Sequence, residues 1–486
     1  MNATPRLAWY PTDKCFIDGR WVAPASGATL PLEDPSRGVE IGAIARGTAA
    51  DVGAAVEAAD RALAGDWGRL TATERGRLLM KLGELVKTRI DDLARIEALD
   101  VGKPIKQGRA DALAMARYME FYGGAADKVM GETIPYLDGY TVYTLREPHG
   151  VTGHIVPWNY PMQIAGRTVG GALAMGNACV LKPAEEACLT SLALAALARE
   201  AGFPPGALNV VPGLGEEAGA ALASHPGVRH VSFTGSVAVG ALVQAAAARH
   251  VAPVTLELGG KSPQHVFADA DLDRAVPFLV NAGVQNAGQT CSAGSRILVE
   301  RSRYGEVVER MGERYRALRV GPADADLDVG PLISVRQKAV VEGFIREGAD
   351  LSLAAESAVI SDAPAGGYYV RPTLFADVKE THRLAQEEIF GPVQVAIAFD
   401  DEAEAAAIAN GTGYGLVAGV WTADGARQMR LAKALRSGQV FINNYGAGGG
   451  VELPFGGVGK SGHGREKGFE ALYGFSTLKT VAAWHG

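Results

Sequence analysis

Short apolar runs alternate with alanine-rich helical stretches between residues 151 and 258. The runs are "VTGHIV", "ACVL", "LNVV", "RHVSF" and "VTLEL", and roughly 20 to 30 residues separate them, as crossovers between parallel strands require. Strands that are buried on both faces show continuous apolar runs of this kind. The pattern therefore predicts a parallel, doubly wound α/β sheet.

Residues 259–460 predict a second α/β domain. The apolar runs "RILVE", "VQVAIAF" and "GQVFINN" again alternate with helical stretches such as "DEAEAAAIAN" and "GARQMRLAKALRSG". No internal repeat or low-complexity linker interrupts this part of the chain.

Residues 71–104 predict one long amphipathic helix. Thr71 and Glu74 form a capping-box pattern at its start, and Gly102 and Pro104 mark its end. The leucines at helical spacing are Leu78, Leu82, Leu85 and Leu93.

Two segments alternate strictly, as exposed antiparallel strands do: "YTVYTLREP" at 140–148 and "GFSTLKTVAAW" near the end of the chain. We expect them to be peripheral strands that pair with another subunit.

Charge and composition narrow the possible partners. The chain has 486 residues, enough for two or three domains, a formal net charge of −7 and a pI near 5.8. Nucleic acid or an anionic membrane would call for a basic surface, so a small soluble ligand is favoured. No stretch approaches the ~18 apolar residues of a membrane span, and the N-terminal residues lack the apolar core of a signal peptide. We expect a cytoplasmic protein.

The four cysteines show neither a CxxC pair nor a Cys/His cluster at metal-ligand spacing, so we expect no disulfide framework and no metal site. Cys291, in "VQNAGQTCSAG", is surrounded by small residues that leave room for a substrate. A cysteine acts as a nucleophile only as a thiolate, whereas an isolated cysteine usually behaves as a small buried hydrophobe. The residues around Cys291 leave both interpretations open.

Polar and glycine-rich segments follow each of the five predicted strands. Ligands of open parallel sheets bind beyond the carboxyl ends of the strands. Any one such loop is adequately explained as a solvated turn, but five together predict a ligand site. Gly235 and Ser236 open a helix directly after a strand, where backbone N–H groups can bind a pyrophosphate, while "GLGEEAG" gives GxGxxxG, a weak signal. The side chains at this edge are Asn159, Lys182, Glu185 and Glu257.

Seven motifs occur together in one order: "PWNYP", "LKPAE", "FTGS", "LELGGKS", "GQTC", "EEIFGP" and "PFGGVGKSGHGRE". In these motifs, and over almost its whole length, the chain resembles the NAD(P)-dependent aldehyde dehydrogenases. The resemblance implies two doubly wound α/β domains plus a small β oligomerisation hairpin, in a homodimer or homotetramer. It assigns 1–124 and 149–258 to the NAD-binding domain, 259–460 to the catalytic domain, and 125–148 with 461–486 to the oligomerisation segment.

The resemblance also implies a mechanism. Cys291 would attack the aldehyde carbon to give a thiohemiacetal, and the Asn159 side chain with the backbone N–H of Cys291 would stabilise the oxyanion. After hydride transfer to the nicotinamide, Glu257 would activate the water that hydrolyses the thioester.

The same resemblance implies an NAD site. Lys182 and Glu185 would contact the adenosine ribose, and Glu185 would favour NAD over NADP, although NADP stays possible. Of the neighbouring acids Glu387 and Glu388, the motif selects Glu388. The implied cofactor residues are Trp158, Lys182, Glu185, Gly215, Gly235, Ser236, Leu258, Glu388 and Phe390.

Arg167 lies where succinic semialdehyde dehydrogenases and some other relatives carry an arginine. It would hold a substrate carboxylate bidentately, or else pair with a carboxylate of the protein. Tyr445 and the following "GAGGGVE" permit a bulky, aromatic substrate or are merely a turn. His463 has no proton-transfer partner, and Thr168 and Gly459 depart from the commonest pattern of the family's motifs.

The alternatives to aldehyde oxidation are a CoA-acylating dehydrogenase, a cysteine esterase and a structural, crystallin-like protein.

Overall fold

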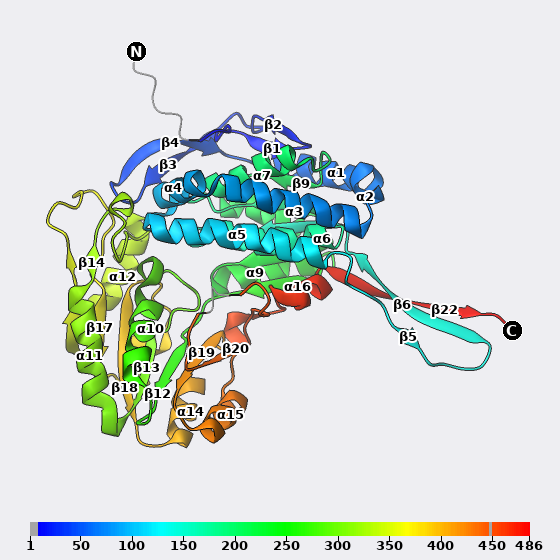
Figure 1. Ribbon diagram of the computed structural model, residues 1–486. Coiled ribbons are helices and arrows are strands. Elements are labelled where there is room, and N and C mark those ends of the chain that lie inside the picture. The colour runs from blue at the N-terminus through cyan, green and yellow to red at the C-terminus, as the bar shows by residue number, and fades with distance from the viewer. Residues whose placement is uncertain (1–7, 447–449) are drawn as a thin grey trace, which may run out of the picture.

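Two α/β domains and a projecting ribbon make up the computed structural model, which describes residues 8–446 and 450–486 (Figure 1). The first sheet has the order β2-β1-β9-β8-β7-β10-β11-β21. Its five central strands are parallel and coincide with the five predicted apolar runs, which confirms that prediction. They are β7 (Val151–Ile155), β8 (Ala178–Lys182), β9 (Leu208–Val210), β10 (His230–Thr234) and β11 (Val254–Glu257).

Antiparallel strands close both edges of this sheet, namely β1 (Cys15–Ile17) with β2 (Arg20–Val22) at one edge and β21 (Gly462–His463) at the other. A separate hairpin joins β3 (Thr29–Asp34) to β4 (Val39–Ala45). The helices of this domain are α1 (Ala49–Ala64), α2 (Asp66–Arg69), α3 (Ala72–Thr88), α4 (Ile90–Val101), α5 (Ile105–Ala125), α6 (Pro161–Ala174), α7 (Leu189–Ala201), α8 (Ala220–Ser224) and α9 (Val237–Ala248).

The second sheet confirms the second predicted α/β domain. Its order is β15-β17-β18-β13-β12-β19-β20, and all neighbours except β15 and β17 are parallel. The strands are β12 (Pro263–Val266), β13 (Arg296–Glu300), β15 (Ser352–Glu356), β17 (Thr373–Ala376), β18 (Val393–Phe399), β19 (Val417–Trp421) and β20 (Gln439–Ile442), and β14 (Arg319–Val320) pairs with β16 (Ala358–Val359) beside them. The helices are α10 (Leu272–Val284), α11 (Tyr304–Ala317), α12 (Val335–Glu347), α13 (Arg383–Gln386), α14 (Glu402–Asn410) and α15 (Gly425–Ala434).

The single helix predicted over 71–104 is wrong, because the structure has two helices, α3 and α4, that meet at Arg89. Arg89 has φ −118° and ψ 17°, outside the helical region. The break allows both helices to pack on the one helix α5. The predicted ends are confirmed, since Thr71 and Glu74 form the capping box and Gly102 ends α4 at φ +86°.

The two alternating segments form antiparallel strands, as predicted, and they pair with each other. β6 (Tyr140–Pro148) pairs with β22 (Ser476–Trp484) along its full length, and β5 (Thr133–Ile134) flanks it. Within 461–486, however, β21 joins the first sheet and α16 (Gly468–Gly474) packs on α6, so the part that projects is β22.

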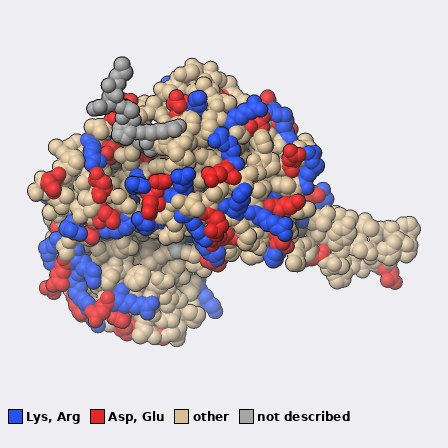
Figure 2. All heavy atoms as spheres, turned by 45° about the horizontal axis from the view of Figure 1, so that its top comes forward, with Lys and Arg blue, Asp and Glu red and all other residues tan. Residues whose placement is uncertain are grey.

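Charged side chains of both signs are interspersed over the main body, whereas the projecting ribbon shows few of them (Figure 2). Leu478 and Trp484 on the ribbon are exposed. Among the described residues, no helix is long and apolar enough to cross a membrane, and no cluster of His, Cys, Asp or Glu could hold a metal ion.

From the subunit pairing expected of these strands, we predict that Leu478→Asp lowers the molecular mass of the particle in solution, because it places a charge on the exposed apolar surface of the ribbon. Light scattering after gel filtration measures this mass. Val335→Asp, at an exposed position at the start of α12, is the control and should leave the mass unchanged. Equal masses for both variants and the parent protein would refute a ribbon-mediated interface.

Candidate active site

A cavity of about 80 Å³ lies between the two domains, beside Cys291. Asn159 and Arg167 from the first domain line it together with Cys291. The structure therefore brings Asn159 and Arg167 together with Cys291, which is far from both in the sequence. Further lining comes from Phe278 and Asn281 of α10 and from Tyr445, Phe455 and Lys467 near the C-terminus.

The loop that carries Cys291 is held in an unusual backbone conformation. Asn286, Ala287 and Gly288 all have positive φ angles, at 50°, 54° and 72°. Asn286 Nδ2 donates to the backbone oxygen of Asn159 (2.9 Å), which ties the loop to the first domain. A Cβ on Gly288 would lie 2.1 Å from the Gly391 oxygen, so only glycine fits there. Left-handed non-glycine residues persist only where the surroundings hold them.

Asn159 presents its side-chain amide beside Cys291. The residue is buried, and its Nδ2 donates to the backbone oxygen of Gln289 at 2.9 Å. An amide nitrogen carries two N–H donors, so one remains for a substrate oxygen.

Cys291 is partly exposed, whereas Cys15, Cys179 and Cys188 are fully buried. Burial raises the pKa of the Cys291 thiol to about 12, against the opposing effect of the Arg167 guanidinium. Burial therefore disfavours the thiolate, which is the form in which a cysteine acts as a nucleophile.

Glu257 ends β11 and is buried with neither carboxylate oxygen hydrogen-bonded. Burial raises the pKa of this carboxyl well above its ordinary value, and Arg167 opposes the shift. A Cβ on Gly456 would lie 2.7 Å from Glu257 Oε1, so the glycine leaves space for the carboxylate. Glu257 also acts electrostatically on Cys291, where it helps to raise the pKa of the thiol.

Arg167 forms a buried ion pair with Glu466 and also donates to Thr234 Oγ1 at 3.2 Å. Glu466 accepts a second hydrogen bond from the Ser232 hydroxyl at 2.6 Å. The arginine thus lines the cavity and pairs with a protein carboxylate at the same time.

The predicted adenosine and pyrophosphate residues lie at the carboxyl ends of β8 and β10. Lys182 Nζ contacts Glu185 Oε2 at 2.9 Å. Gly235 follows β10 directly, and Ser236 caps α9 by accepting from the Val239 N–H. Gly215 opens a short helical turn whose Gly219 lies beside Lys182, with 3.8 Å from an added Cβ to Lys182 Cδ.

Four further residues were predicted for the cofactor site, namely Trp158, Leu258, Glu388 and Phe390. Glu388 Oε1 accepts from the Gly260 N–H at 3.0 Å, and burial raises the pKa of Glu388 to about 7. Trp158 and Phe390 make an edge-to-face ring contact at 5.3 Å. Leu258 lies against α9, where a Cβ on Gly240 would come within 2.6 Å of Leu258 Cδ2. By contrast, the exposed Glu387 pairs with Arg383.

This donor set fits a dinucleotide. An ion-paired lysine and glutamate and a helix N-terminus follow strands of the first sheet, and Glu388 of the second domain reaches the same edge by accepting from the Gly260 N–H. Ribose, pyrophosphate and second ribose would require groups of these kinds.

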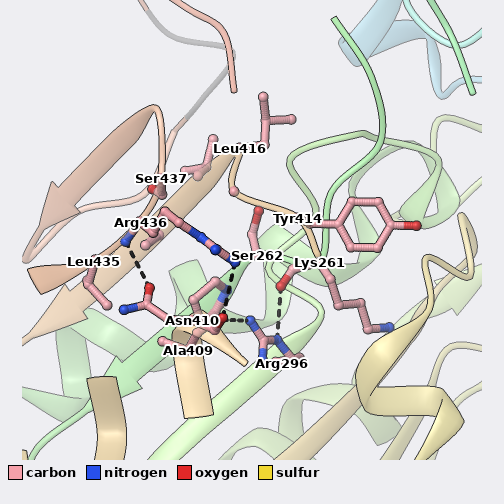
Figure 3. A pocket seen from close by; sticks show the side chains of 14 residues that line it. Lys261, Ser262, Arg296, Ala409, Asn410, Tyr414, Leu416, Leu435, Arg436 and Ser437 are labelled. Carbon is pink, nitrogen blue, oxygen red and sulfur yellow. Dashed lines mark hydrogen bonds between the residues drawn. The ribbon is translucent and has the colours of Figure 1, made fainter. Parts of the chain in front are cut away.

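A second, much smaller cavity lies under the turn Gly259–Ser262 and holds no such set (Figure 3). Arg296 points into the protein there and donates to the backbone oxygens of Lys261, Ile408 and Ala409 at 2.7 to 2.9 Å. The Lys261 ammonium points away from this group. At about 10 Å³ the cavity holds one water at most.

Sequence reasoning missed Glu466 and Lys467, both of which are buried at the site. They follow "SGHGR" in a stretch rich in charge, which is typical of a solvated surface. No helical or strand periodicity in the sequence indicated that these two residues are buried. His463, in the same stretch, is exposed on β21 and weakly contacts Gln244 at 3.5 Å. Tyr445 lines the cavity, but part of the following loop, 447–449, lies outside the described residues.

The family model for the aldehyde dehydrogenase family matches residues 21–481. The chain belongs to the aldehyde dehydrogenase family. It is similar to a protein of Burkholderia cenocepacia that carries a provisional aldehyde dehydrogenase name, with 65% identity, a TM-score of 0.97, and 97% of this chain and all of that one covered.

Two further relatives give the range of the similarity. An aldehyde dehydrogenase from Bacillus cereus, solved as an NAD+ complex, is 38% identical with a TM-score of 0.95, covering 98% of this chain and 97% of that one. Human retinal dehydrogenase 2 is 42% identical over 99% of this chain and 93% of its own length. The chain is thus an NAD(P)-dependent aldehyde dehydrogenase by family.

We predict that Glu466→Gln lowers the free energy of unfolding by about 3–5 kcal/mol, because it leaves the Arg167 guanidinium buried without a counter-charge. Urea denaturation measures this quantity. The double variant Arg167→Met with Glu466→Gln should recover part of the loss, and a double variant less stable than either single one would contradict the ion-pair explanation.

Proposed function

We propose that this chain oxidises an aldehyde to a carboxylic acid with NAD through a covalent intermediate on Cys291. The supporting observation is that Cys291, the one partly exposed cysteine in the described ranges, shares a cavity with Asn159, and that the buried Glu257 carboxyl acts electrostatically on its sulfur. In this proposal the three residues supply the nucleophile, the oxyanion donor and the base.

In the first step Cys291 loses its S–H proton to a base or to water, and the resulting thiolate Sγ bonds to the aldehyde carbon while the carbonyl π electrons move onto the oxygen. The second N–H of Asn159 Nδ2 and the backbone N–H of Cys291 donate to the developing oxyanion, and one donor of this kind typically contributes ~3 kcal/mol. NAD, when bound along the sheet edge, supplies the hydride acceptor. The acyl group then remains on Cys291 as a thioester.

The second step releases the acid. Glu257, in its ionised form, accepts a proton from a water molecule, and the water oxygen bonds to the acyl carbon while the Cys291 sulfur leaves. A carboxyl with a raised pKa is the stronger base for this transfer. Because Gly456 has no side chain, the Glu257 carboxylate can lie close to the Gly456 backbone.

NAD is preferred to NADP in this proposal. The Lys182 ammonium forms an ion pair with Glu185, so its charge is already balanced. The 2′-phosphate of NADP would therefore be repelled by the Glu185 carboxylate. The NAD+ complex of the Bacillus cereus relative supports the same cofactor. NADP remains a weaker alternative.

The substrate we propose is a semialdehyde or an aromatic aldehyde. Tyr160, Phe278, Tyr445 and Phe455 give the cavity aromatic walls, and Arg167 adds a guanidinium. Because Glu466 already holds Arg167, a substrate carboxylate would have to share that guanidinium. We further propose a cytoplasmic homo-oligomer.

We predict that Glu257→Gln releases one equivalent of NADH per active site and then stops, because the thioester forms but water is not activated. Stopped-flow absorbance of NADH measures the burst. Cys291→Ser should give no burst, and Asn159→Ala should give a burst slowed by about 10²-fold.

Added CoA should leave the turnover of the parent protein unchanged, and acceleration by CoA would favour the CoA-acylating alternative.

We predict that Arg167→Lys raises KM for a carboxylated aldehyde at least about tenfold while changing KM for a neutral aromatic aldehyde by less than about threefold. A lysine keeps the charge opposite Glu466 but loses the bidentate geometry. Steady-state kinetics with both aldehydes test this. Equal changes in the two KM values would rule out carboxylate recognition by Arg167.

A further inference from the structure

Lys467 brings a second cation to the cavity that contains Cys291. The residue precedes α16, is buried, and lines the cavity with Cys291 and Arg167. Its ammonium lies 5.2 Å from the centroid of the Phe455 ring, and the Arg167 guanidinium carbon lies 5.1 Å from the same centroid. One aromatic ring therefore attracts both cations and holds them at this wall.

The charged and titratable groups around this cavity come from several elements. Arg167 on α6 is in contact with Glu466, whose charge it balances. Glu257 at the end of β11 is buried, which favours its neutral acid form. Burial likewise keeps Tyr118 and Tyr122 on α5 neutral, since it raises the pKa of both phenols. Arg465 also acts electrostatically on Glu257, and Glu388 acts on Cys291.

Cys291 and Lys467 are electrostatically coupled. Burial, followed by repulsion from Arg167, lowers the pKa of Lys467 to about 7, and the Cys291 sulfur is the first of the groups that oppose this shift. Moving one proton from the thiol to the lysine amine breaks the S–H bond, forms an N–H bond and leaves the net charge of the cavity unchanged. The resulting thiolate and ammonium stabilise each other, which offsets the burial that disfavours the thiolate alone.

We propose that the Lys467 ammonium stabilises the Cys291 thiolate and so acts as the positioning residue that makes this sulfur nucleophilic. The inference rests on the proposed function, in which Cys291 is the nucleophile. It explains how Cys291 can react as a thiolate although burial favours the protonated thiol.

The test is the rate at which iodoacetamide alkylates Cys291 across the pH range, without NAD or aldehyde. Intact mass and peptide mapping identify the product, and Cys291→Ser supplies the blank, since the other cysteines are fully buried. Lys467→Met and Lys467→Gln should each move the midpoint upward by about one pH unit, which lowers the rate near neutral pH about tenfold. Lys467→Arg, which keeps the charge, should stay within about threefold of the parent rate.

The control is Lys460→Met, which removes an exposed lysine from the same C-terminal segment and should leave the profile unchanged. A folded Lys467→Met or Lys467→Gln with the parent profile overturns the proposal, as does Lys467→Arg shifted as far as Lys467→Met. Retained thermal unfolding temperature defines a folded variant. NADH formation from aldehydes by the parent protein is measured separately, so failure of the proposed function and failure of this inference give different results.

Discussion

The buried ion pair between Arg167 and Glu466 connects the parts of the chain that form the cavity. Arg167 belongs to α6, and Glu466 belongs to the C-terminal segment that returns from the second domain to the first sheet. Ser232 on β10 donates to Glu466, and Thr168 donates to Ser232 at 2.9 Å. A charge buried without its partner is strongly destabilising, so each of these elements constrains the position of the others.

Desolvation then sets the protonation states at the site. Cys291, Glu257 and Glu388 all have raised pKa values because burial disfavours their charged forms, and Lys467 has a lowered one for the same reason. Such shifts collect where burial and charge coincide, which is typical of active sites. In a water-filled cavity the Cys291 thiol and the Glu257 carboxyl would keep their ordinary pKa values, and they would have little tendency to exchange protons at neutral pH.

Local patterns predicted most of the fold but missed features that depend on distant partners. The five apolar runs gave the parallel strands because a strand buried on both faces needs continuous apolar residues. The break at Arg89 was not predictable, since helical spacing continues through it and the break is required only by packing on α5. Two neighbouring acids look alike in sequence, yet Glu387 pairs with Arg383 at the surface while Glu388 accepts from the Gly260 backbone inside the cleft.

The sequence by itself determined the two α/β domains, the family and the residue types available for chemistry, because periodicity and ordered motifs are properties of the chain alone. Only the tertiary structure decided that Arg167 is bound by Glu466, that Lys467 lines the same cavity as Cys291, and that burial raises the pKa of the Cys291 thiol. The reason is physical: a pKa and an ion pair depend on the distance to water and to other charges, and folding sets both.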